Sequence, residues 1–142
     1  MKTLFICPFS PAKNASQAGH RLAFEYISEI AVNSNVDIIL LLRNGQSIDQ
    51  TLTEIPNVNI IKVKYFGIWQ IIWNFIYMGS VSSFFTRYSK AFKEEMLFLI
   101  EKNKYDVLRL EFSQVFYYAI ALRNKFSDKI HIQLAVHDIQ LK

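Results

Sequence analysis

A histidine–aspartate pair, His137-Asp138, directly follows the last apolar run of the chain, residues 130–136. If that run is a strand of a parallel sheet, the pair lies at the strand's carboxyl end, where open α/β sheets bind their ligands. A histidine there can bind a hydroxyl group, or act as an acid or base near neutral pH. A lone histidine is more often structural, but the position and the acidic neighbour make His137 the candidate catalytic residue.

Glu111 occupies a similar place after the earlier apolar run at residues 107–110. A carboxylate at the carboxyl end of a strand can accept hydrogen bonds from a sugar or orient a nearby base. The alternative is an acid that only stabilises the start of the next helix, through Ser113 and the helix dipole. Both interpretations of Glu111 stay open.

Gly19, His20 and Arg21 form the third candidate site, after a loop at residues 9–17 that follows the first apolar run. The free N–H groups at the start of a helix favour anions or sugar hydroxyls, and a glycine permits close approach of a ligand to the backbone. The segment lacks the G-x-G-x-x-G pattern, which counts against a dinucleotide site. An ordinary strand-to-helix loop is the alternative.

No set of His, Cys, Asp and Glu in the sequence has metal-ligand spacing, and no Ser-His-Asp arrangement stands out. We therefore expect no metal ion. Cys7, the one cysteine, lies inside the first apolar run and is expected to be a buried, inert thiol. His131 lies at the start of its run, the wrong edge of a sheet for a ligand.

The elements that must position these residues follow from apolar spacing. Apolar runs predict strands, and apolar positions three to four residues apart predict helices. We predict strands at residues 3–7, 36–42, 58–63, 107–110 and 130–136, and helices at 22–31, 84–103 and 115–122. The alternation predicts an α/β fold, a Rossmann-like doubly wound parallel sheet, as one domain over residues 1–142.

An aromatic segment at residues 66–78 carries Trp69 and Trp73 and is too short to span a bilayer. It resembles a helix that lies in the membrane interface, where Lys62 and Lys64 could meet anionic lipid. The alternative, which we favour, is an aromatic helix packed on the core or on a partner.

The composition excludes several classes of protein. Hydrophobic residues make up 51% of the chain and charged residues 20%, which excludes intrinsic disorder. The net charge of +4 fits an anionic ligand or membrane surface, but the basic residues are scattered, so we expect no nucleic-acid partner. The first apolar run is short and closed by Pro8, so we expect no secretory signal and a cytoplasmic protein, with peripheral contact at the inner membrane face left open.

The order of these motifs resembles the N-terminal domain of a GT-B glycosyltransferase of the retaining family 4. Four segments carry the resemblance: the strand and Pro-rich loop at residues 4–11, the glycine and helix at 19–31, the phrase Asp106-Val-Leu-Arg-Leu-Glu111-Phe-Ser-Gln114, and Val136-His137-Asp138. The resemblance covers nearly the whole chain. Each motif matches only loosely, and the order and spacing of the four motifs carry the resemblance.

The resemblance implies transfer of a sugar from a nucleotide-sugar donor, used as substrate with no further cofactor, to a glycan or lipid-linked acceptor. The resemblance also implies that the configuration at the anomeric carbon is retained, and that the enzyme acts in cell-surface polysaccharide biosynthesis. By position, Gly19 would approach the donor phosphates, Glu111 would line the acceptor side and His137 would contact the transferring sugar. Asp138 would orient its neighbours.

Two features depart from the family pattern. The family often has paired glycines where this chain has Gly19-His20, and Arg21 is a weak match to a basic residue of that helix. We expect the donor-binding C-terminal domain to lie outside this chain, so that the chain alone is inactive, binds nucleotide-sugar weakly and can form a homodimer. A non-catalytic Rossmann-like binding or membrane-docking module, completed by a second chain, is the alternative.

Overall fold

A single parallel sheet organises the chain in the computed structural model, which describes residues 1–78 and 86–136. Its strands are β1 (Lys2–Cys7), β2 (Asn35–Arg43), β3 (Val58–Phe66), β4 (Val107–Glu111) and β5 (His131–Ala135). Its helices are α1 (Ala18–Ala31), α2 (Gln50–Thr53), α3 (Ile68–Met78), α4 (Lys90–Asn103) and α5 (Phe116–Phe126), with a 3₁₀ turn at Ser113–Val115 before α5.

The strand order is β3-β2-β1-β4-β5, and every neighbouring pair is parallel. All residues of β2 from Val36 to Leu42 are buried, as expected of a strand covered on both faces. The predicted Rossmann-like doubly wound α/β fold is confirmed.

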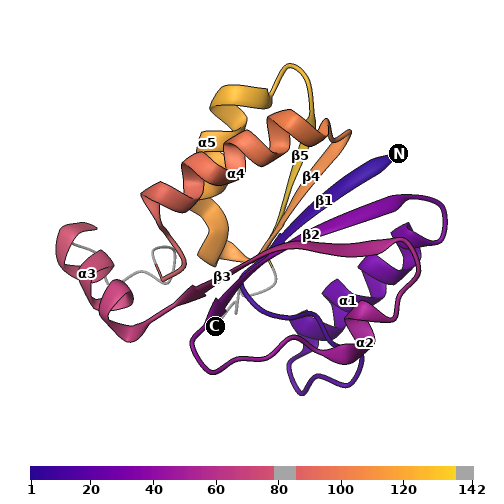
Figure 1. Cartoon of the computed structure of the whole chain (residues 1–142), viewed down its shortest axis with the longest axis horizontal. Coiled ribbons are helices and arrows are strands. Elements are labelled where there is room, and N and C mark those ends of the chain that lie inside the picture. The colour runs from indigo at the N-terminus through magenta and orange to yellow at the C-terminus, as the bar shows by residue number, and fades with distance from the viewer. Residues whose placement is uncertain (79–85, 137–142) are drawn as a thin grey trace.

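Helices cover both faces of the sheet, so the core has two layers (Figure 1). On one face α1 and α2 pack against Phe5, Cys7 and alternate residues of β2. On the other face α4 and α5 pack against Leu4, Ile6 and the intervening residues of β2. Cys7 is fully buried, as predicted, and burial raises the pKa of its thiol well above the ordinary value.

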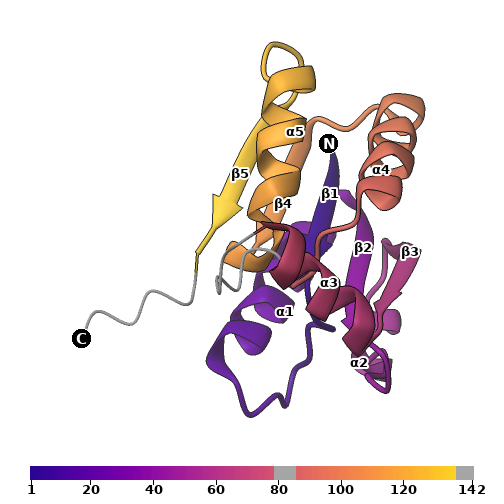
Figure 2. The ribbon, with the colours of Figure 1, turned by 90° about the vertical axis from the view of Figure 1, so that its left-hand side faces the viewer.

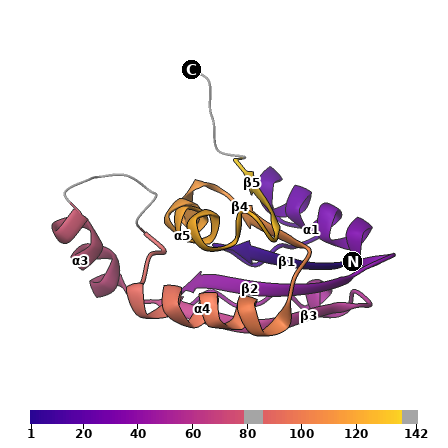
Figure 3. The same ribbon diagram turned by 90° about the horizontal axis from the view of Figure 1, so that it is seen from above.

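Helix α3 lies outside both layers. It follows β3 after Gly67, beyond the carboxyl ends of the strands (Figures 2 and 3). Within the described residues, no helix is both long enough and apolar enough to cross a membrane.

The helix predicted at residues 84–103 begins later than expected, at Lys90. Ser89 caps it, because the Ser89 hydroxyl accepts a hydrogen bond from the Phe92 N–H at 3.3 Å. Residues 86–88, which precede the cap, are not helical, and Arg87 is buried with its Nε donating to the Leu41 carbonyl at 3.0 Å. The apolar spacing was right, but the start of the helix was wrong.

Candidate functional site

The site with the strongest structural argument lies between the carboxyl ends of β1 and β4. From β1 the chain winds outward through β2 to β3, and it then returns to place β4 and β5 on the other side of β1. The loops after β1 and β4 therefore leave the sheet toward opposite faces. The position between them, which we name the crevice, is where ligands bind in open α/β sheets. Gly19 and His20, at the start of α1, there contact Phe112, the residue that follows Glu111 at the end of β4.

Three aromatic rings pack together at this position. His20 stacks on Phe9 with ring centroids 3.9 Å apart and an interplanar angle of 8°. Phe112 meets Phe9 edge-on at 4.7 Å and His20 at 6.5 Å. We name Phe9, His20 and Phe112 the aromatic cluster; it joins the loop after β1, the first turn of α1 and the residue after β4.

Gly19 lies directly against this cluster. A Cβ atom at Gly19 would lie 2.2 Å from Cζ of Phe112, far inside contact distance. The group that approaches the Gly19 backbone in the structure is therefore the Phe112 ring. Packing alone explains why no larger residue fits at this position.

Phe112 has a strained backbone. Its φ of 71° and ψ of 156° fall in a region that is essentially restricted to glycine. Its N–H donates to the Ala135 carbonyl at 2.7 Å, which ties the end of β4 to the end of β5. Strain of this kind costs about 1–3 kcal/mol and concentrates at functional sites.

Glu111 is fully buried, and its charge is matched by Arg109. Arg109 Nε donates to Glu111 Oε1 at 2.6 Å, while Nη1 donates to Gln133 at 3.2 Å. The guanidinium also lies 3.9 Å from the centre of the Tyr26 ring in α1. The carboxylate is thus directed into the protein beneath α1, which makes Glu111 a fixed charge under the crevice.

Two other predicted residues have identifiable surroundings. Burial lowers the pKa of the half-buried His20 below 6.5, so its imidazole is neutral at neutral pH and has one donor and one acceptor nitrogen. Arg21 Nη1 donates to the Ala15 carbonyl at 2.9 Å and so holds the loop before α1. Gln17, which precedes α1, makes no side-chain capping hydrogen bond to the helix.

His137 and Asp138, the predicted catalytic residue and its neighbour, lie outside the described residues 1–78 and 86–136. The described chain reaches the crevice at Ala135, through its hydrogen bond from Phe112. Of the predicted site residues within the described ranges, the structure brings Gly19, His20 and Glu111 to one crevice.

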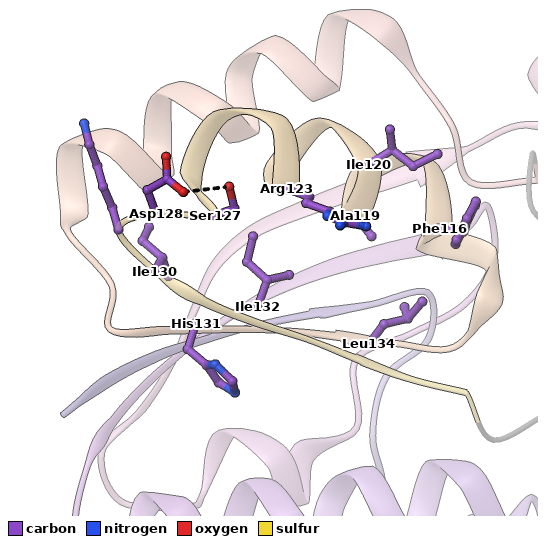
Figure 4. A pocket seen from close by; sticks show the side chains of 11 residues that line it. Phe116, Ala119, Ile120, Arg123, Ser127, Asp128, Ile130, His131, Ile132 and Leu134 are labelled. Carbon is purple, nitrogen blue, oxygen red and sulfur yellow. Dashed lines mark hydrogen bonds between the residues drawn. The ribbon is translucent and has the colours of Figure 1, made fainter.

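A groove of about 780 Å³ lies elsewhere, along α5 and the outer strand β5 (Figure 4). Ile120 and Arg123 of α5 face Ile132 and Leu134 of β5 across it. This groove follows the outer edge of the sheet and is separate from the crevice beside β1. Its lining includes His131, the histidine that the sequence places at the start of a strand.

Three residues of the site, Phe9, Phe112 and Arg109, were not predicted from the sequence. Arg109 and Glu111 are two residues apart in a strand, so their side chains share one face of the sheet, and this spacing could have predicted the ion pair. No sequence signal predicts Phe112, because a non-glycine residue in a glycine-type conformation contradicts the local preference.

Comparisons of the chain with protein-family models, curated proteins and solved structures each gave no match. The chemistry that the site can perform therefore follows from its own side chains. The described part offers stacked rings, one neutral imidazole and a buried charge pair. These groups suit binding and orientation of a polar ring compound more than bond breaking.

Proposed function

We propose that this chain is the N-terminal, acceptor-side domain of a retaining GT-B glycosyltransferase that uses a nucleotide-sugar donor. The proposal rests on the motif order described above, which resembles family 4. The observation that supports it best is the meeting of the α1 start, with Gly19 and His20, and the β4 end, with Glu111, at one crevice. The resemblance requires these segments to share one site.

The groups in the crevice are compatible with a sugar acceptor. A neutral His20 can donate one hydrogen bond and accept another, as a sugar hydroxyl requires of its partner. Phe9 and Phe112 offer aromatic surface beside it. The buried Arg109–Glu111 pair supplies a rigid support beneath the site rather than a reacting group.

In the proposed enzyme His137 contacts the transferring sugar and Asp138 orients its neighbours. The opposite wall of the cleft belongs to a C-terminal donor-binding domain. The acceptor is a glycan or a lipid-linked saccharide of cell-surface polysaccharide biosynthesis. The reaction takes place on the cytoplasmic side.

The test is to express the complete reading frame that contains residues 1–142 and to incubate it with uridine, guanosine and adenosine diphosphate sugars plus saccharide acceptors. We expect acceptor-dependent nucleotide release, with the anomeric configuration of the donor retained in the product by NMR. His20→Ala should reduce this rate, and Phe98→Ala, which alters an exposed phenylalanine on α4, should not. A reading frame with a second Rossmann-like domain but no sugar-dependent release would contradict the proposal.

One observation favours a second candidate, a non-catalytic Rossmann-like binding module completed by another chain. The Phe112 ring takes the space next to Gly19 that a donor phosphate would need for close approach. For this candidate we expect a reading frame that stops after Lys142 and no nucleotide release under the same conditions.

A further inference from the structure

Helix α3 has an inverted distribution of side chains. Its outward residues are all apolar or aromatic, whereas its two polar residues, Gln70 and Asn74, are on the half that faces the protein. The exposed fractions of the outward side chains are 65% for Ile68, 72% for Trp69, 38% for Ile72, 54% for Trp73, 65% for Ile76 and 79% for Tyr77. At ~100° per residue these six positions form one continuous face over about half of the helix. We name them the α3 face.

The structure holds this face in a fixed direction. Ile71, on the opposite side of the helix, is buried, and the Asn74 amide donates to the Tyr88 carbonyl at 2.9 Å. Tyr88 in turn packs on Tyr118 of α5, with ring centroids 5.6 Å apart. The helix is therefore anchored through its polar side while its apolar side is exposed. The predicted packing of α3 on the core is wrong for these six residues. Packing of α3 on a partner stays a prediction.

The chain segment that contains α3 carries charged residues of one sign only. Residues 55–93 contain five basic residues and no Asp or Glu, although the chain as a whole has 12 acidic residues. Lys62 pairs with Glu95, Lys93 pairs with Glu94, and Arg87 is buried. Lys64, four residues before the helix, and Lys90, at the start of α4, form no ion pair with any described residue.

We propose that the α3 face docks on an anionic membrane surface, with α3 lying in the plane of the interface. Trp and Tyr are the residues that concentrate at this depth, and a helix with one apolar face and basic flanks binds there flat. Lys64 and Lys90 supply the complementary charge for acidic headgroups. The inference does not depend on the proposed function, since it uses none of the crevice residues.

A second copy of the chain is a poorer occupant of the same face. Contact between two α3 faces about a two-fold axis would bring the unpaired Lys64 and Lys90 of both copies to the same interface. The repulsion between them would oppose the association that the apolar contact favours. An acidic lipid surface has the opposite charge to Lys64 and Lys90, and its apolar interior can bury the α3 face.

The chain offers a clean optical test, because its two tryptophans, Trp69 and Trp73, both belong to the α3 face. The 142-residue protein is mixed with vesicles of phosphatidylglycerol and phosphatidylcholine in equal parts, and separately with pure phosphatidylcholine. We expect co-sedimentation and a blue shift of tryptophan emission with the anionic vesicles, both weakened by salt, and quenching by brominated lipid. Binding to pure phosphatidylcholine should be much weaker.

Variants assign the binding to the α3 face. Trp69→Gln combined with Trp73→Gln should lower vesicle partitioning more than tenfold, and Lys64→Gln or Lys90→Gln about fivefold each with anionic vesicles. Phe98→Gln removes a 65% exposed aromatic residue from α4 and is the matched control, with partitioning unchanged. Circular dichroism checks that each variant is folded.

Three results would overturn the proposal. The first is a folded protein that does not sediment with anionic vesicles. The second is vesicle binding that survives the double tryptophan change. The third is a blue shift that depends on protein concentration without lipid, which would assign the face to a second copy.

Discussion

The contact between Gly19 and Phe112 makes the most specific prediction about the crevice. Gly19→Ala adds one methyl group, and that methyl would lie 2.2 Å from the tip of the Phe112 ring. The ring has little freedom to move away, because its edge packs on Phe9 and the Phe112 N–H is bonded to the Ala135 carbonyl. One of these contacts must therefore change.

Two opposing effects decide the magnitude. Forcing an extra carbon into a filled space costs about 1–3 kcal/mol. Replacing glycine by alanine within a helix gains up to about 1 kcal/mol, and less in a first turn. We therefore expect Gly19→Ala to lower the free energy of unfolding by about 1–2 kcal/mol. With Phe112→Ala already present the clash is gone, and Gly19→Ala should be neutral or stabilise slightly.

A double-mutant cycle in urea measures this coupling, with unfolding followed by circular dichroism because both tryptophans lie on α3. Phe112→Ala keeps a Cβ atom, so the backbone strain at residue 112 is the same in all four proteins of the cycle. The expected coupling between the two substitutions is about 2 kcal/mol. If Gly19→Ala destabilises the protein equally with and without the Phe112 ring, the packing explanation for Gly19 is refuted.

Further experiments address the electrostatics and ligand affinity of the site. Because burial lowers the pKa of His20, the unfolded chain binds its proton more readily; the stability from neutral His20 is complete above pH ~6.5 and falls as the pH drops below it. Urea midpoints between about pH 7.5 and 5.5 should fall less steeply in His20→Phe than in the parent, and equal slopes would contradict this. Arg109→Met leaves Glu111 buried without its ion pair and should lower the free energy of unfolding by about 3–5 kcal/mol. Lys125→Met breaks an exposed ion pair and should cost at most about 1 kcal/mol, so equal losses would argue against the buried pair. Calorimetry of residues 1–142 with nucleotide-sugars should detect no micromolar binding; such binding would contradict the assignment of the donor to another domain.

The sheet was predictable because its strands are apolar runs with clear ends. β2 is the clearest case, since seven consecutive residues are buried and the charged or polar residues at its ends are exposed. The buried faces of the helices were less predictable, because a stripe of apolar residues does not fix how the helix is rotated about its axis. The apolar spacing of α1 predicts a buried stripe that includes Leu22, but Leu22 is 50% exposed and Phe24 is buried instead. Ser89 is a favourable N-cap residue and marks the start of α4 at Lys90. The helix was predicted to start earlier because the apolar spacing continues before Ser89.

The candidate site was predictable only in its location. Gly19, His20 and Glu111 were assigned to one edge of the sheet because parallel strands share their carboxyl edge, and the structure places them there. Their contacts depend on Phe112, whose conformation is unfavourable for its own residue type and is held by Ala135, a residue distant in sequence. Local preference cannot anticipate a conformation that a distant strand imposes.

The strand order also constrains how the chain folds during synthesis. β1 pairs with β2 and with β4, so the first strand made needs a partner that begins at Val107. The unit β1-β2-β3 is complete at Phe66, and the next 45 or so residues take about 2–9 s at typical translation rates of ~5–20 residues per second. Until α4 and β4 have been made, the edge of β1 and the face of the sheet that α4 and α5 cover lack these native contacts. Chaperone binding to the nascent chain should therefore be strongest when about 70–110 residues have emerged from the ribosome.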